Sequence, residues 1–207
     1  MAPPIDPTAV IFYTKKDFGG DAYPYKVGED VALPAGLNDK FLSVNVGIAA
    51  KVLAWRDYGK KGPHREWTGA NPDISDIEGL SCFMVIEGDT HVIAFLFKDA
   101  TGGADRQYSL EVKAKDVGDV TMPSNDGDQY HVVGLMPSGG EAVTTAIYVR
   151  DVNSGVYIAN GSVYFEWNSK TNQVDIFEDD NWPKQLKKER SGPSEFIVTL
   201  IDNKPSE

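Results

Sequence analysis

Short stretches in which apolar and polar residues alternate recur along the chain. Residues 107–114 are the clearest case, with these apolar side chains on one face: Tyr108, Leu110, Val112 and Ala114. This period of two is what a half-buried β-strand requires, because successive side chains point to opposite faces of a sheet. Val163, Phe165 and Trp167 alternate in the same way. Both segments are therefore predicted to be strands.

Short apolar runs predict further strands at residues 10–13, 52–55, 83–86, 92–97, 131–136, 146–149 and 196–201. Glycine-rich turns separate many of these runs, as at residues 18–21 and 101–104. A helix is predicted only over residues 183–190, between Asn181 as a cap and Gly192 as a stop. Many short strands joined by such turns indicate an all-β chain of β-sandwich type.

The length and charge of the chain limit both its size class and its partners. Its 207 residues, 41% of them hydrophobic, can form one large domain or two of about 100 residues each. Residues 1–89 carry 9 Lys or Arg against 13 Asp or Glu, and residues 90–207 carry 11 against 18. A nucleic acid or an anionic membrane surface attracts a positively charged protein, and both halves of this chain carry a net negative charge. We therefore expect no nucleic-acid partner.

Cysteine use and hydropathy limit the chain further. Cys82 is the one cysteine, so neither an intramolecular disulfide nor a cysteine-rich metal site can form. No stretch approaches 18 consecutive apolar residues, so no membrane span is expected. The first seven residues lack the pattern of a signal peptide, which makes a cytoplasmic location the expectation, with secretion by another route left open.

The first 89 residues contain a repeat. Tyr13 and Trp55 each begin a segment of an aromatic residue, six residues and a glycine, which ends at Gly20 and Gly62. Each segment is followed, about 20 to 30 residues later, by a Leu-Ser step into another strand, at residues 42–43 and 80–81. A hairpin folded back over a sheet would explain this pattern, because glycine permits a close approach and the serine hydroxyl can bond free backbone groups of the hairpin.

These motifs resemble the βγ-crystallin Greek key family. Leu37-Asn-Asp-Lys-Phe-Leu-Ser43 and Asp73-Ile-Ser-Asp-Ile-Glu-Gly-Leu-Ser81 are similar to its late-strand motif. The resemblance implies a double Greek key domain over residues 8–89, with keys at 8–47 and 50–89. Residues 90–203 are predicted to form a second β-sandwich domain. Two weaker aromatic-x6-Gly matches, at Phe95 and Tyr148, leave open whether that domain is a diverged crystallin-like one or an unrelated sandwich.

The resemblance also implies calcium binding through oxygen ligands. The matching positions in the first key are Glu29, Asp39 and the carbonyl of Lys40, and those in the second key are Asp76, Ile77 and Glu78. At the fifth motif position, where the family has a hydroxyl ligand, this sequence has Leu42 and Leu80. Leucine supplies no oxygen, so we expect calcium binding that is weak or degenerate.

Other candidate sites have ordinary structural interpretations. Trp67 and Trp182 are candidates for an aromatic platform that binds a glycan or a protein, with packing onto the domain as the alternative. The sequence Asn125-Asp-Gly-Asp128 has the short spacing of a calcium loop but lacks the distal glutamate, which favours a solvated turn. Three scattered histidines match no catalytic motif, and Cys82 lies in an apolar strand, so no enzyme is expected.

Two functions of different classes remain. The first is a non-enzymatic βγ-crystallin-like protein, structural or stress-related, with weak calcium binding. The second is a binding or effector protein on a crystallin-like scaffold, of the microbial toxin, glycan-binding or inhibitor type. The fold by itself does not distinguish these functions.

Overall fold

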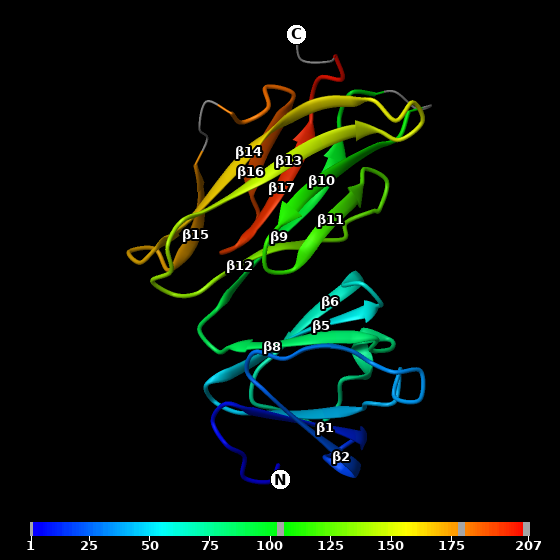
Figure 1. The fold of residues 1–207 in the computed structure, drawn as a ribbon, viewed down its shortest axis with the longest axis vertical. Coiled ribbons are helices and arrows are strands. Elements are labelled where there is room, and N and C mark those ends of the chain that lie inside the picture. The colour runs from blue at the N-terminus through cyan, green and yellow to red at the C-terminus, as the bar shows by residue number, and fades with distance from the viewer. Residues whose placement is uncertain (1, 103–105, 178–180, 205–207) are drawn as a thin grey trace. The chain divides into compact units, whose positions relative to one another are not determined.

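The computed structural model describes residues 2–102, 106–177 and 181–204 and divides into two compact units, Met1–Thr90 and His91–Glu207 (Figure 1). Within the described residues, β-strands make up almost all of the regular structure, with one short 3-10 helix. The predicted all-β fold class is therefore confirmed. No helix in this part of the chain is long and apolar enough to cross a bilayer.

The first unit consists of two four-stranded sheets. Its elements are β1 (Ala9–Lys15), β2 (Gly19–Lys26), β3 (Asp30–Ala32), β4 (Ser43–Val46), β5 (Ala50–Asp57), β6 (Lys61–Trp67), β7 (Ala70–Asn71), the 3-10 helix η1 (Ser75–Ile77) and β8 (Cys82–Glu87). The strand orders are β2-β1-β4-β7 and β3-β8-β5-β6. Each sheet thus takes three strands from one predicted key and one from the other, so the two keys interlock.

The hairpin of the first key is held as its motif predicts. The Ser43 hydroxyl donates to the Lys15 carbonyl (2.7 Å) and accepts from the Phe18 amide (3.0 Å), so it joins the start of β4 to the β1–β2 turn. Gly20 has a φ of 79°, and a Cβ atom there would collide with the Thr14 hydroxyl. Glycine is required at this position because the turn needs both the left-handed backbone and the space.

The core of the first unit is aromatic at its centre. Phe12 is fully buried and lies 4.6 Å from Phe83 and 4.9 Å from Phe41 between ring centroids. Trp67, which is 6% exposed, packs edge-on against Phe12 at 6.2 Å. These rings come from both sheets and from the loop before β4, so the core joins the two keys into one domain.

The second unit is a sandwich of another kind. Its strands are β9 (His91–Asp99), β10 (Tyr108–Ala114), β11 (Gly118–Pro123), β12 (His131–Met136), β13 (Val143–Asp151), β14 (Tyr157–Asn168), β15 (Gln173–Phe177), β16 (Leu186–Arg190) and β17 (Glu195–Leu200). They form sheets of order β11-β10-β13-β14-β15 and β12-β9-β17-β16, and β9 and β17 run parallel. The strand pairing of the first unit, all antiparallel, differs from this arrangement. The second unit is therefore not a second double Greek key.

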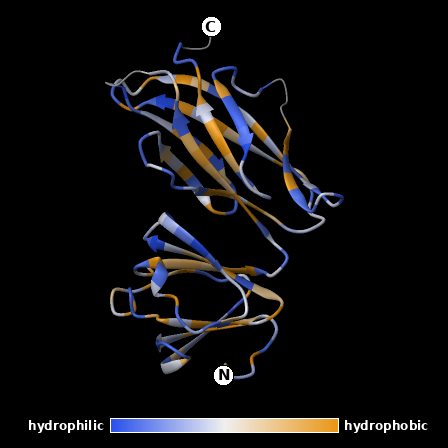
Figure 2. Ribbon diagram, turned by 180° about the vertical axis from the view of Figure 1, so that it is seen from behind, coloured by the Kyte–Doolittle hydropathy of each residue, from blue (hydrophilic) through white to orange (hydrophobic). Residues whose placement is uncertain are grey.

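The alternation read from the sequence corresponds to the two faces of the strands. In β10 the apolar set from Tyr108 to Ala114 is at most 4% exposed, whereas Lys113 is exposed. Hydrophobic and hydrophilic bands accordingly alternate along strands of this unit (Figure 2). All of the predicted apolar runs lie in strands, apart from Ile201, which follows the end of β17.

The predicted helix at residues 183–190 is wrong. Its second half is the edge strand β16, which pairs with β17 from Leu186 to Arg190. These eight residues show neither the helical nor the strand spacing of apolar side chains, so the local sequence does not distinguish a helix from a strand. Pairing with β17 makes the segment a strand.

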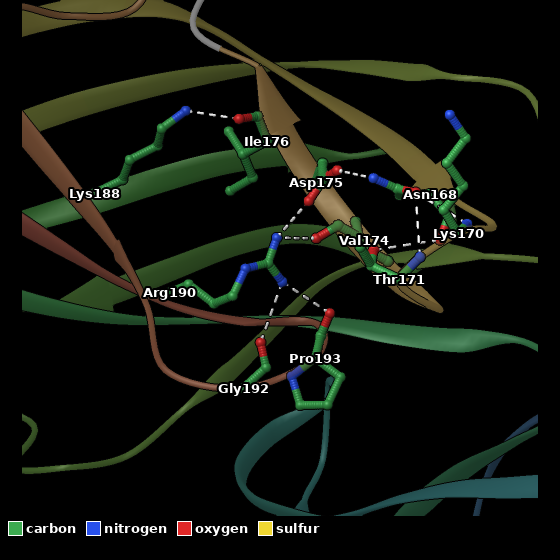
Figure 3. A network of polar contacts seen from close by, with 10 residues as sticks. All are labelled: Asn168, Lys170, Thr171, Val174, Asp175, Ile176, Lys188, Arg190, Gly192 and Pro193. Carbon is green, nitrogen blue, oxygen red and sulfur yellow. Dashed lines mark hydrogen bonds and ion pairs between the residues drawn. The ribbon is translucent and has the colours of Figure 1, made fainter.

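Side chains of β16 reach across to β15, the edge strand of the other sheet (Figure 3). Arg190 Nη2 donates to the Val174 carbonyl and to the Asp175 carboxylate, both at 2.7 Å. Lys188 Nζ donates to the Ile176 carbonyl at 2.7 Å. These bonds satisfy carbonyl groups on a sheet edge and connect the two sheets along one side of the sandwich.

Candidate metal site

An acidic hollow of about 520 Å³ opens on the first unit. Three segments form it: the loop before β4, the β5–β6 hairpin, and the turn between η1 and β8. The residues that line it are Asn38, Asp39, Arg56, Asp57, Tyr58, Glu78 and Ser81. Residues from both keys therefore contribute to one site.

The backbone at two of these acids is left-handed, with φ of 59° at Asp39 and 56° at Glu78. The Asp39 amide donates to the Leu80 carbonyl (3.2 Å), which ties the two motif loops together. Gly79 has a φ of 117°, and a Cβ atom there would collide with the Asp39 carboxylate. The glycine thus allows the carboxylate to lie against the opposite loop.

The charges in the hollow are unbalanced. Asp39, Asp57 and Glu78 supply three carboxylates, and Arg56 supplies one positive charge, with Nη2 3.2 Å from Asp57 Oδ2. The pKa of Arg56 is raised, mainly by its hydrogen bond to Asp57 and, to a smaller extent, by Glu78. The lining is therefore more negative than its one arginine can neutralise.

Asn38 adds a neutral oxygen to this site. Its amide nitrogen donates to Asp39 Oδ2 at 2.7 Å, which turns the amide oxygen away from that carboxylate. The oxygen is buried, and within the described part of the chain it has no hydrogen-bond partner. A buried acceptor without a partner costs free energy.

The other key presents a related arrangement that is already neutralised. The Ile74 amide donates to the Leu42 carbonyl (3.0 Å), as the Asp39 amide does to that of Leu80. Beside Ile74, the Asp73 carboxylate lies 2.6 Å from the Lys16 ammonium and accepts two hydrogen bonds from Ser75. These contacts, that of Lys16 first, hold the pKa of Asp73 well below its ordinary value. The Lys16 ammonium thus already balances the charge of this carboxylate.

The structure separates the ligands predicted for the second key. Asp76 pairs with Arg65 of β6, with Oδ2 and Nε 2.9 Å apart, and neither Asp76 nor Ile77 is among the residues that line the hollow. Glu78 lies in the hollow together with Asp39, although the two were predicted for different sites.

The remaining first-key positions are elsewhere. Neither Glu29 nor Lys40 is among the residues that line the hollow. The Glu29 carbonyl accepts from the Val85 amide at 2.8 Å as β3 joins β8. Leu80, at 1% exposure, belongs to the core, and its carbonyl accepts from the Asp39 amide.

Five of the lining residues were not predicted from the sequence as members of a site: Asn38, Arg56, Asp57, Tyr58 and Ser81. The signal for Asp57 was its place in the aromatic-x6-Gly segment from Trp55 to Gly62, which the sequence predicted to be a hairpin. Among the described residues, no group of three Asp, Glu, His or Cys side chains is close enough to hold a metal ion. A cation here would therefore depend on amide and backbone oxygens as well as carboxylates.

The two tryptophan candidates are packed to different degrees. Trp67 is a core residue, so its interpretation as an exposed platform is wrong. Trp182 is half-buried: its indole nitrogen donates to the Leu186 carbonyl (2.9 Å), and Lys188 Nζ lies 5.5 Å from the ring centroid.

The structure also tests the predictions made for the 125–128 turn and for Cys82. In the 125–128 turn, Asp126 lies 2.9 Å from His131 Nε2 and Asp128 lies 3.0 Å from Lys98 Nζ, so both acids already have partners. Cys82 is 3% exposed, as predicted for a core thiol, and burial raises its pKa.

Comparisons with known proteins place a different family in each unit. Residues 6–87 match the model described as Beta/Gamma crystallin, and residues 93–201 match the model described as Membrane binding. The chain is 29% identical over 219 residues to Calcium-dependent cell adhesion molecule 1 of Dictyostelium discoideum, covering 97% of this chain and 99% of that protein.

Two solved structures from Neurospora crassa are also similar. The Abundant Perithecial Protein is 62% identical, with a TM-score of 0.88, and the match covers 99% of this chain and all of that one. The βγ-crystallin domain of that protein, solved in a Ca2+-bound form, is 56% identical and covers 44% of this chain and all of its own, with a TM-score of 0.43.

Proposed function

We propose that this chain, which belongs to the βγ-crystallin family, is a non-enzymatic protein that binds calcium weakly in its first unit and associates with membranes through its second. The acidic hollow, in which three carboxylates face one arginine, is the observation that carries the calcium part. The match of residues 93–201 to a membrane-binding family supports the other part. The Dictyostelium relative, named as a calcium-dependent adhesion molecule, spans both units.

Calcium suits the hollow because it accepts six to eight oxygen ligands in flexible geometry. Asp39, Asp57 and Glu78 offer carboxylates, and backbone carbonyls and water can complete the shell. Two features keep the affinity low: Arg56 competes for Asp57, and Leu80 replaces a hydroxyl ligand. These features fit association with a membrane surface that responds to calcium concentration better than a purely structural or stress-related role. A cytoplasmic location stays a prediction.

Calcium titration of the full chain by calorimetry, after removal of calcium with a chelator, tests the first part. We expect measurable heat and a rise in the unfolding temperature of the first unit, because a ligand that binds only the native state stabilises it. Asp57→Asn and Glu78→Gln should each weaken binding, whereas Asp73→Asn is the matched control, since Lys16 already neutralises that carboxylate. Unchanged unfolding in millimolar calcium, or equal affinity in Asp57→Asn, would contradict the proposal.

Co-sedimentation of the full chain with phosphatidylcholine vesicles, in calcium and in chelator, tests the membrane part. We expect the protein in the vesicle pellet in at least one condition. Its complete recovery in the supernatant in both would remove this part and leave the calcium part standing.

A further inference from the structure

The hairpin that joins β13 to β14 (Figure 1) has exposed apolar side chains in and beside its turn. Val152, Val156 and Tyr157 are 47%, 51% and 51% exposed, and we call these three residues the tip patch. Exposed apolar residues are ordinary when scattered, but three at one turn of a domain are a candidate contact surface.

The backbone of this turn needs no water to satisfy its donors. Each amide from residue 152 to residue 156 donates a hydrogen bond within the unit: Val152 to the Gln107 carbonyl (2.8 Å), Asn153 and Ser154 to Asp151 Oδ1 (2.9 and 3.0 Å), Gly155 to the Asp151 carbonyl (2.8 Å), and Val156 to the Ser154 hydroxyl (3.4 Å). Unsatisfied backbone groups are the main cost of placing irregular backbone in lipid. The backbone N–H groups of this turn are all hydrogen-bonded within the unit, so they would not add that cost.

The Asp151 carboxylate that organises the turn is itself shielded. The residue is 7% exposed, and hydrogen bonds from the Ser154 and Asn153 amides hold its pKa below the ordinary value. Arg106 also attracts it electrostatically. The turn is therefore a fixed structure with its apolar side chains outward and its one acid inward.

Charged groups of both signs stand next to the tip patch: Arg150, and Glu111, whose Oε2 accepts from the Tyr157 hydroxyl at 3.2 Å. The Arg150 guanidinium lies 5.9 Å from the centroid of the Tyr157 ring, and its Nε donates to the Gly155 carbonyl (3.3 Å). Arginine can bind phosphate with its remaining donors, and tyrosine favours the interface between lipid and water. The apex of the turn is polar, with Asn153 and Ser154 exposed; on either side of it come a valine and then arginine or tyrosine.

The net charge of the second half bears on which type of lipid surface the tip patch could contact. Residues 90–207 carry 11 basic and 18 acidic residues, so a general attraction to anionic lipid is excluded. We propose that the tip patch enters the surface of a zwitterionic membrane, with Arg150 at the level of the phosphates. This inference rests on the membrane part of the proposed function and names the surface that carries it.

Binding of the full chain to phosphatidylcholine vesicles, compared between wild type and Val152→Ser with Val156→Ser, tests the assignment. Both side chains are half exposed, so folding should be retained, and removing their apolar contact should weaken binding about tenfold. Ile48→Ser removes a side chain that is 92% exposed in the first unit and should leave binding unchanged.

A fluorescent label gives a second measurement that leaves the valines in place. Cys82 is buried, so Ser154→Cys provides one accessible thiol for an environment-sensitive dye, and Lys170→Cys, in the β14–β15 loop, is the matched control. We expect vesicles to shift the emission at position 154 to the blue and to leave position 170 unchanged.

The outcomes separate this inference from the proposed function. Wild-type binding that persists in the double serine variant, or a shift at position 170 and none at position 154, would overturn the tip patch and leave membrane association standing. A wild-type chain that binds no vesicle would overturn both. Weakened binding together with a shift at position 154 alone supports the inference.

Discussion

The Lys16 ammonium lies 2.6 Å from the Asp73 carboxylate and joins the β1–β2 hairpin of the first key to the motif loop of the second. The first unit has two related loop arrangements, one at Asp39 and one at Asp73, and this ion pair is present only at the second. In the acidic hollow the carboxylates outnumber the one arginine, whereas at Asp73 a lysine and two hydrogen bonds from Ser75 already satisfy the acid. One calcium site per chain is the consequence that we expect.

The Lys16–Asp73 pair predicts a defined pH dependence. The pKa of Asp73 is lowered in the folded state, so the pair stabilises the fold above the unfolded pKa of about 3.9 and loses this effect as pH falls towards the lower folded value. Asp73→Asn should therefore lower the unfolding temperature at pH 7 by a small amount, since both side chains are about half exposed, and by less at pH 2.5. Thermal unfolding of both proteins at several pH values measures this. An equal effect of the substitution in a Lys16→Met background would contradict the pairing.

Leu80 shows that a motif position can serve the core. Because it is 1% exposed within the hydrophobic cluster, Leu80→Ala should destabilise the first unit by about 2–5 kcal/mol. Leu42→Ala, at the half-buried equivalent position, should cost less. Urea unfolding gives both values, and equal losses would show that burial does not distinguish the two leucines.

Gly62 links the repeat motif to the hollow. Its φ is 72°, and a Cβ atom would collide with the Asp57 carboxylate, so Gly62→Ala should cost at least about 1–2 kcal/mol and should also weaken calcium binding by displacing Asp57. Gly36→Ala is the matched control, because nothing lies within 4 Å of its added methyl group and its φ is not left-handed. Chemical denaturation and calorimetry of both variants test this, and a neutral Gly62→Ala would refute it.

Arg190 predicts a loss of stability in the second unit. Its guanidinium bonds Val174 and Asp175 of β15 and lies 4.8 Å from the centroid of the Phe196 ring. Because Arg190 and Asp175 are about one-third exposed, Arg190→Met should cost about 1–2 kcal/mol in denaturant unfolding, less than a fully buried pair. Lys187→Met, on the same strand and exposed, should have no measurable effect. Equal behaviour of the two variants would mean that the contacts between β15 and β16 add nothing.

The sequence by itself determined the strands and the family of the first unit. Alternation of the kind seen from Tyr108 to Ala114 specifies a strand locally, because one face must be buried and the other solvated. The aromatic and glycine repeat specified the hairpins, because Gly20 and Gly62 need backbone conformations that other residues avoid. The short segment at 183–190 had no such pattern, and only its pairing with β17 made it a strand.

The tertiary structure alone decided which acids meet. The sequence assigned Asp39 and Glu78 to separate sites and left Asp57 out, although the crossing of the two keys brings all three to one hollow. It also decided that Asp73 is neutralised by Lys16 and that the apolar residues of the β13–β14 turn remain outside the core. The period of apolar residues along a strand indicates which side chains are buried. Contacts between distant loops depend on how whole strands are arranged in the two sheets, and no local sequence pattern predicts that arrangement.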